Sequence, residues 1–541
     1  MKTNSNILLR ILLGLTIFLL AGLSVLQMIP PCVVPTSAPA TRFSAERAMR
    51  DMQVVAREPH PAGSEAQARV RAYIVEQVEA IGLTAEIETS GQISNILVRV
   101  PGSDPTGTIL VSAHYDSHPP APGAGDNGIS VVAMLEALRV LSAGQPLRND
   151  LLFLYTDGEE LGWRGAYAFM QAHPEAKDEV GVLLVFDSLP GNAPLSLIET
   201  SPGDAWLVRQ ITGLSLPFWT GSWKNIQERQ EMDTDFDAFQ PAGFTGMAFE
   251  NEANGTRYHT DQDAVEAISP RLVQAYGQTM LALASRFGGV DMTTHAKSPD
   301  LVFFSLSLLR LVAYPYWLMQ GLCILAILAL LTFVIIAWSR GYFSPGHFGL
   351  SLLGLLLGIV VITLCGQFAW GVVKNAHAVE LAVFEGFEGS AEWQAGFMAG
   401  AAVLLTVLLA FLSRRFGGIH LASASAVLFL LAAFLINAST GTDNPLTTAW
   451  IAWSFIGCVT GMGVLLFTRD QVWKVVLLSL SSLLTLALAL PRLWMGTFTR
   501  EDAWLTVLVT CIWMVLFAPQ VDALFGHALA KENPAQSMEK P

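Results

Sequence analysis

The chain has 541 residues, which is too many for one ordinary soluble domain, and 52% of them are hydrophobic while only 14% are charged. That balance is unusual for a soluble protein and indicates a large apolar part. The net charge of −14 provides no basic field that could hold phosphates, so we expect no nucleic acid among its partners.

Polar residues are unevenly distributed along the chain. Most acidic residues lie between Thr41 and Asp300, and the remainder is strongly apolar. The five cysteines are Cys32 and four in apolar runs, which excludes a disulfide framework and a cysteine-based metal site in the polar part. We therefore expect an anchor and linker at 1–41, a polar globular domain at 42–300, and a membrane domain with a short tail at 301–541.

The first apolar stretch runs from Ile7 to Ile29. It is longer than a signal-peptide core of roughly 7–15 residues, so we expect a retained transmembrane helix. The competing interpretation is a signal peptide cleaved near Ala38-Pro39-Ala40. Residues 30–39 are rich in proline and are expected to form a spacer.

The polar part alternates between predicted strands and helices. Helices are expected from Phe43, over Glu65–Ile81, Asn127–Leu141 and Trp163–Ala172. Strands are expected at Ala85–Thr89, Asn95–Val100, Thr108–Ala113, Leu151–Tyr155, Val182–Phe186 and Thr245–Phe249. Near-continuous apolar strands between helices predict an α/β fold with a mixed sheet flanked by helices on both faces. In such sheets ligands bind beyond the carboxyl ends of the strands.

The last part contains seven apolar runs, each near the ~20 residues that span a bilayer. They are Tyr316–Trp338, Phe348–Val373, Ala395–Leu412, Ile419–Ile436, Thr447–Phe467, Val472–Leu490 and Ala503–Val521. With the first helix, they predict an all-α domain in a multi-pass membrane protein of eight spans. No chain of buried ionisable groups of the kind used by pumps is evident in these runs.

Charges between the spans predict the orientation. If the N-terminus is cytoplasmic, the inside connections carry Arg340, Arg414 and Arg469, and the acidic loop at 380–392 lies outside. Basic residues favour the cytoplasmic side, although Arg492 and Arg500 are exceptions. We therefore expect the polar domain to face the periplasm, the cell exterior or a lumen, and the C-terminus to be cytoplasmic.

Polar side chains follow the strand predicted at Thr108–Ala113. His114 and Asp116 point to the same side, because residues two apart on a strand do so, and a carboxylate can fix the tautomer and orientation of a metal-binding histidine. Asp126 follows a loop of prolines and glycines that can fold back towards them. A carboxylate there can give one oxygen to each of two metal ions.

Other predicted strands end in polar side chains as well. In the turn at 157–160 (DGEE), neighbouring side chains diverge, so one glutamate can bind a metal while the other handles protons. Asp187 ends a further strand, and His259 supplies a second histidine. Nitrogen and oxygen ligands without sulfur suit zinc in an open catalytic site. Two ions sharing a carboxylate can polarise a carbonyl and activate water.

Taken in order, five motifs resemble the M28 family of zinc aminopeptidases: HYDS at 114–117, GAGDNG at 123–128, DGEELG at 157–162, FD at 186–187 and YHTDQD at 258–263. The resemblance covers roughly residues 43–288. PHPAGS at 59–64 and DLVFF at 300–304 are similar to the membrane-anchored branch that includes the endoplasmic-reticulum metallopeptidase and the vacuolar membrane protease.

This resemblance implies two zinc ions per chain. One would be held by His114, Asp126 and Asp187. The other would be held by Asp126, Glu160 and His259, so that Asp126 bridges the two ions. Each of these positions carries a residue able to bind metal.

The resemblance also implies the catalytic residues. Glu159 would be the general base that takes a proton from water and passes it to the leaving amine, and Asp116 would orient His114. The expected function is a membrane-bound exopeptidase that removes residues from the free N-terminus of peptides. Its expected partners are such peptides and the lipid bilayer, and the sequence does not indicate an oligomeric state.

Three alternatives remain open at this point. The same scaffold supports glutaminyl cyclisation and carboxypeptidase chemistry. A membrane scaffold or receptor could keep the fold without activity, although that class usually loses ligands. Transport by the seven-span region is the third.

Several further residues are interpreted differently. We expect His118 to be a solvated loop histidine and His60 to brace a turn. Asp233, Asp235 and Asp237 resemble a calcium ladder, but the missing glycine and glutamate favour an active-site loop instead.

Overall fold

The computed structural model describes residues 2–26, 29–203, 205–214, 216, 219–220, 234–251, 257–294, 297–306, 310–377, 390–440, 445–496 and 503–526. Most of the acidic loop at 380–392, Arg500, the tail and Asp233 lie outside these residues. The chain divides into a unit at Gln27–Ala313, here called the α/β unit, and a helical unit formed by Met1–Leu26 and Tyr314–Pro541.

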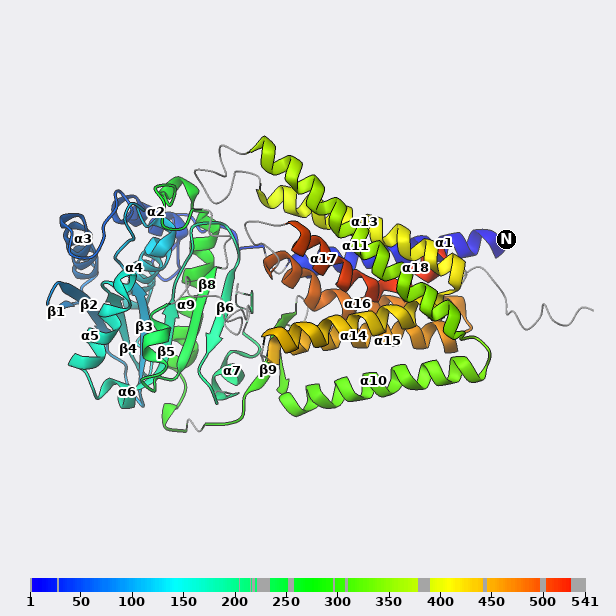
Figure 1. The fold of residues 1–541 in the computed structure, drawn as a ribbon. Coiled ribbons are helices and arrows are strands. Elements are labelled where there is room, and N and C mark those ends of the chain that lie inside the picture. Colours follow the sequence, from blue (N-terminus) through cyan, green and yellow to red (C-terminus); the bar gives the residue numbers. More distant parts are fainter. Residues whose placement is uncertain are drawn as a thin grey trace, which may run out of the picture. The chain divides into compact units, whose positions relative to one another are not determined.

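A single mixed sheet organises the α/β unit (Figure 1). Its strands are β1 (Ala85–Ser90), β2 (Ile93–Val100), β3 (Thr108–His114), β4 (Asp150–Thr156), β5 (Val180–Phe186), β6 (Leu195–Thr200), β7 (Trp219–Thr220) and β8 (Gly246–Asn251). Their order is β1-β2-β4-β3-β5-β8-β6-β7. The four central strands β4, β3, β5 and β8 are parallel. β1 pairs antiparallel with β2, β2 with β4 and β6 with β8, whereas β6 and β7 pair in parallel. The predicted mixed α/β sheet is thus confirmed, and β6 and β7 are strands that the sequence analysis missed.

Helices cover both faces of this sheet. They are α2 (Ala45–Val55), α3 (Glu65–Ala80), α4 (Ile129–Ser142), α5 (Arg164–Ala172), α6 (Ala176–Glu179), α7 (Ala205–Ile211), α8 (Phe236–Phe239) and α9 (Pro270–Gly288). Short helical turns lie at η1 (Ala124–Gly128), η2 (Glu159–Leu161), η3 (Val265–Ala267) and η4 (Met292–Thr294), and β9 (Leu301–Leu306) pairs with β10 (Arg310–Pro315) in a separate small sheet.

Alternation along the central strands builds the two hydrophobic layers. On β3, Ile109 and Val111 join the core formed with α2, α4 and α9, while Leu110 joins the opposite core with α5 and α8. All three side chains are fully buried. A strand covered on both faces has to be apolar throughout, which explains why the predicted strands read as continuous apolar runs.

Local sequence signals set the helix starts that the analysis expected. The hydroxyl of Ser44 accepts a hydrogen bond from the Arg47 amide at the start of α2, and Ser64 does the same for Gln67 at α3. Such N-caps satisfy amide groups that the first turn of a helix leaves free. The proline-rich segment before α2 is attached to this unit, since the Val34 amide donates to the Gln274 side chain.

Long helices form the second unit. They are α1 (Lys2–Leu26), α10 (Tyr316–Ser339), α11 (Pro345–Ala376), α13 (Ser390–Phe416), α14 (Gly418–Thr440), α15 (Pro445–Phe467), α16 (Gln471–Gly496), α17 (Ala503–Met514), η5 (Val515–Phe517) and α18 (Ala518–Phe525). Among the described residues, six helices are long and apolar enough to cross a membrane, including α1 and the α17–α18 segment. The other two predicted spans correspond to apolar helices that are shorter in the described chain, Ile451–Phe467 and Gln471–Leu486.

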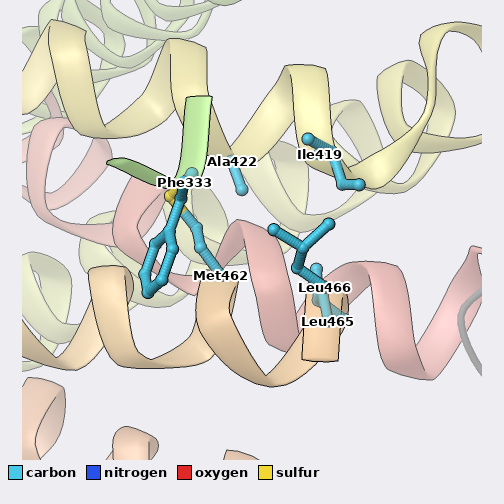
Figure 2. A pocket seen from close by; sticks show the side chains of 6 residues that line it. All are labelled: Phe333, Ile419, Ala422, Met462, Leu465 and Leu466. Atoms are coloured by element: carbon cyan, nitrogen blue, oxygen red, sulfur yellow. The ribbon is translucent and has the colours of Figure 1, made fainter. Parts of the chain in front are cut away.

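Packing within the helical unit involves α1 directly. Leu13 of α1 is fully buried in a cluster with residues of α15, α16 and α18, and the Arg10 guanidinium donates to the Gly526 carbonyl at 3.3 Å. A small pocket between α10, α14 and α15 is lined by apolar side chains alone (Figure 2). It contains none of the predicted site residues and has no group suited to chemistry.

Among the described residues of this unit, the ionisable side chains that are nevertheless buried include Lys474, Asp522 and His420. Lys474 and Asp522 are 7% and 6% exposed, and the Ser413 hydroxyl donates to the Asp522 carboxylate. Both residues lie within a few positions of a helix end, at the start of α16 and the end of α18. Two residues near helix ends are not a chain of ionisable groups along the helices. Transport by this unit therefore stays as open as it was after the sequence analysis.

Candidate metal centre

The predicted site residues of the α/β unit come together at the carboxyl ends of three adjacent parallel strands. His114 is the last residue of β3, Asp187 follows β5, and Glu159 and Glu160 follow β4 in η2. In the register of β3 with β4, His114 lies opposite Thr156, so the turn after β4 begins beside the histidine. The topology therefore gathers residues that are far apart in the sequence, as the rule for open α/β sheets predicts.

Asp126 reaches this edge from the η1 turn, which requires a close backbone approach. A Cβ atom on Gly125 would lie 2.3 Å from the Cα of Pro190, so only glycine fits there. The buried Asp263 carboxylate accepts hydrogen bonds from the amides of both Gly125 and Asp126. These contacts fix the turn, and with it the direction of the Asp126 side chain.

The first potential metal group consists of His114, Asp126 and Asp187. Their ligand atoms lie within 4.8 Å of one another, and all three residues are buried. The Nε2 atom of His114 is 3.2 Å from the Asp126 carboxylate and 3.5 Å from that of Asp187.

The second group lies on the other side of the Asp126 carboxylate. The Nε2 atom of His259 is 3.1 Å from Glu160 and 3.4 Å from Asp126. Asp126 uses its Oδ1 towards His114 and its Oδ2 towards His259. One carboxylate thus presents a different oxygen to each histidine, which is the arrangement that a carboxylate bridging two ions needs.

His118 also belongs to this second group. Its ligand atoms lie within 4.8 Å of those of Glu160 and His259, and its ring stacks on the His259 ring. The interpretation of His118 as a solvated loop histidine was therefore wrong. The prediction for His60 is supported, because its ring Nδ1 contacts the Glu58 carbonyl at 3.0 Å and its backbone pairs with Ser117.

Asp116 and Glu159 occupy the positions next to the first group. The Nδ1 atom of His114 is 3.1 Å from the Asp116 carbonyl and 3.6 Å from its carboxylate, an environment that favours a proton on Nδ1 and leaves Nε2 as the ligand. The Asp116 carboxylate also accepts a hydrogen bond from the Glu159 amide at 3.1 Å. The Glu159 carboxylate lies 4.0 Å from the His114 Nε2 atom.

Crowding of buried carboxylates shifts the proton affinities in the site. Burial raises the pKa of Glu159 well above its usual range, and burial with the charge of Asp126 raises that of Glu160 to about 7. Burial opposes ionisation of Asp126 too, but its interactions with the neighbouring imidazoles of His114 and His259 hold its pKa below the usual range. Burial likewise raises the pKa of Asp187. The site thus gathers more negative charge than its histidines neutralise, and a divalent cation would relieve this excess.

The unsatisfied atoms of the site fit a metal as well. The Nε2 atoms of His114 and His259, the Nδ1 atom of His118 and the Oε1 atom of Glu160 are buried without a hydrogen-bond partner. Buried polar atoms normally have partners, and a metal ion bound in this site would supply one. Imidazole nitrogens and carboxylate oxygens without sulfur are the donor set of catalytic zinc sites.

Two acidic residues that were not among the predicted ligands or catalytic residues also contribute to the site. Asp263 was quoted only as part of a motif, and its function as the acceptor for the η1 amides requires the folded loop. Asp235 of the aspartate-rich loop is buried and accepts a hydrogen bond from the Thr156 hydroxyl at the end of β4, and burial raises its pKa to about 7. This contact supports the active-site loop over the calcium ladder.

The fold and the site together define a class of protein, an α/β protein with a carboxylate–histidine centre at the strand ends that could hold metal. Residues 95–284 match the model of peptidase family M28. The chain therefore contains an M28 peptidase domain, and its membrane-anchored relatives bear out the suspected branch.

Those relatives are longer proteins that are named as a protease or a metallopeptidase. The chain is 31% identical to the vacuolar membrane protease of Candida albicans over 273 residues, covering 48% of this chain and 32% of that protein. It is 28% identical to the human endoplasmic reticulum metallopeptidase 1 over 232 residues, covering 41% and 26%. The matched part thus spans about a third or less of the length of these relatives.

Solved structures show weaker similarity. The Legionella pneumophila LapA aminopeptidase superposes with a TM-score of 0.40 at 14% identity, covering 46% of this chain and 74% of that one. The Porphyromonas gingivalis glutaminyl cyclase superposes with a TM-score of 0.37 at 17% identity, covering 45% and 99%. Similarity at this level does not distinguish between the two activities.

The role of Asp263 leads to a first test. In Asp263→Asn, one acceptor oxygen becomes an NH2 group that faces a backbone amide, so the turn that aims Asp126 should loosen. We expect metal affinity to fall by about 10- to 100-fold, as for other residues that support metal ligands. Metal content after dialysis, measured by mass spectrometry, checks this. The exposed neighbour provides the control, and Asp261→Asn should retain wild-type metal content.

Proposed function

We propose that the protein is a membrane-bound, zinc-dependent exopeptidase that hydrolyses the N-terminal peptide bond of peptides. The observation that carries this proposal is the Asp126 carboxylate, with one oxygen towards His114 and the other towards His259. Zinc is typical of M28 peptidases, and the donor set fits it. The proposed sites are His114, Asp126 and Asp187 for one ion, and Asp126, Glu160 and His259 for the other.

When bound, two zinc ions would polarise the scissile carbonyl and make water acidic enough to lose a proton near neutral pH. The residues of the chain handle that proton. Glu159 lies beside the first group without being one of its proposed ligands, so its carboxylate can accept a proton and then give it to the leaving amine. Asp116 orients both His114 and Glu159. Its carbonyl contacts the Nδ1 atom of the His114 ring, and its carboxylate accepts a hydrogen bond from the backbone amide of Glu159.

The role of Glu159 is tested by Glu159→Gln. The amide keeps the size of the side chain but cannot accept the proton, so turnover should fall by about 10²- to 10⁴-fold while zinc content stays near that of the wild type. The matched neighbour, Glu160→Gln, should instead lose zinc, because Glu160 is a proposed ligand. Wild-type turnover in Glu159→Gln, or in wild-type protein stripped of zinc by exhaustive chelation, would contradict the mechanism.

Exopeptidase activity is a finer claim that rests on the family, and it has its own test. The purified protein is incubated with peptides that carry a free amine, a blocked amine or an N-terminal glutamine, and the products are identified by mass spectrometry. We expect stepwise loss of N-terminal residues from free-amine peptides only, and none with Glu159→Gln. Pyroglutamate formation would establish a cyclase, loss of C-terminal residues a carboxypeptidase, and binding without products a receptor.

The orientation is also part of the proposal. Basic residues between the apolar helices favour the cytoplasmic side, and the curated relatives are named after the endoplasmic reticulum and the vacuole. We therefore place the α/β unit outside the cytoplasm, in a periplasm, at the cell exterior or in a lumen, with the C-terminus cytoplasmic. The expected partners are peptides with a free N-terminus and the surrounding lipid.

Cys32 offers a direct test of this orientation. It is exposed at the start of the α/β unit, whereas the other four cysteines lie on the apolar helices. A membrane-impermeant maleimide added to spheroplasts or sealed lumen-out vesicles should label the wild type, and Cys32→Ser should remain unlabelled. Labelling that appears only after the membrane is permeabilised would reverse the proposed orientation.

A further inference from the structure

The two histidines of the metal centre are oriented in different ways. The His114 ring is held through its Nδ1 atom by Asp116. The described contacts of the His259 ring, apart from those at Nε2, are with two other rings. His118 stacks on it with 3.9 Å between centroids and 5° between planes, and Tyr258 stacks on it at 3.7 Å and 22°.

These two rings must lie on opposite faces of His259. A stacked ring at less than 4 Å fills the space above one face of an imidazole, so a second ring at a similar distance has only the other face. His259 is therefore sandwiched between His118 and Tyr258. Rotation of the imidazole about its bond to Cβ would drive it into one of these rings, so the sandwich fixes the direction of Nε2.

The backbone of His259 makes this restraint necessary. His259 has a φ of 57°, and the Thr260 amide donates to the Arg257 carbonyl at 3.2 Å, so the residue occupies the third position of a tight turn, where glycine is usual. A non-glycine residue in this region is strained and persists only where its surroundings enforce it. The ring of a residue on such a turn needs neighbours that determine its orientation.

His118 is well placed to supply that support, because its loop is anchored on both sides. Its carbonyl accepts a hydrogen bond from the Ala121 amide at 2.7 Å. The preceding Ser117 hydroxyl accepts from the His60 amide and donates to the Ala121 carbonyl, both at 2.9 Å. The turn braced by His60 therefore determines where the His118 ring lies.

Direct coordination is the rival explanation for His118, since one of its ring nitrogens lies within 4.8 Å of ligand atoms of Glu160 and His259, and its Nδ1 atom is buried without a hydrogen-bond partner. A metal bound to an imidazole lies close to the plane of that ring. The planes of His118 and His259 are nearly parallel and stacked, so an ion in the plane of His259 lies outside the plane of His118. The observed geometry suits a supporting ring better than a second imidazole ligand.

We propose that His118 is a positioning residue, whose ring fixes His259 with Nε2 towards Asp126 and Glu160 and so sets the affinity of the second metal subsite. The inference rests on the proposed two-zinc centre. In it, His118 supports the second subsite through the face of its ring, which stacks on His259, and not through metal binding by its nitrogens.

The test compares His118→Ala with His118→Phe in the full-length protein. Metal-free protein is titrated with Zn²⁺ against a chromophoric chelator, and bound zinc is counted by mass spectrometry. We expect two ions in the wild type. In His118→Ala the ion in the second subsite should bind about 10- to 100-fold less tightly than in the wild type, as for loss of a group that orients a ligand. The affinity of the first subsite should be unchanged. Phenylalanine keeps the stacked face without a nitrogen, so His118→Phe should restore most of the lost affinity.

Each other outcome has a definite meaning. If His118→Phe is as weak as His118→Ala, a His118 nitrogen binds the ion and the positioning role is overturned. If His118→Ala binds zinc like the wild type, His118 has no role in this subsite, while the proposed function stands. If the wild type itself binds fewer than two ions, the two-zinc centre fails and the inference fails with it. Retention of the first ion in both variants shows that the site has folded.

Discussion

The bridging position of the Asp126 carboxylate is the constraint on which the rest of the α/β unit depends. Its two oxygens face two histidines from distant parts of the chain, inside a site that also holds Asp187, Glu159 and Glu160. So many buried carboxylates are costly unless a cation or protons compensate for them. Burial together with neighbouring carboxylates raises the pKa values of Glu159 and Glu160. The architecture can therefore be understood as the means of holding these groups together against their repulsion.

The sheet and the loops share that task. Parallel pairing of β4, β3 and β5 places His114, Glu159 and Asp187 at one edge, and cores on both faces hold the strands in register. Asp126 belongs to no strand, and its position depends on Gly125 and on the Asp263 carboxylate. The strands thus supply the rigid part of the centre. The loops supply residues whose side-chain direction depends on individual hydrogen bonds.

This division explains which features the sequence could predict. Strand ends follow from apolar runs and local chemistry, so His114, Glu159, Glu160 and Asp187 were found together with the six strands that precede or flank them. Strand β6 was missed because it carries none of the motifs that drew attention to the ends of the other strands. His118 was misinterpreted because its significance comes from one stacking contact with His259, more than a hundred positions further along the chain. No periodicity or spacing encodes such a contact.

The difference between the two histidines extends this argument to the chemistry of the centre. His114 is buried at the end of a central strand and is oriented by a hydrogen bond from its ring, so the fold itself fixes its direction. His259 is more exposed, with 27% of its side chain accessible, and lies on a turn in an unfavourable backbone conformation. The first subsite is therefore built into the core, whereas the second is assembled from loops that pack ring against ring.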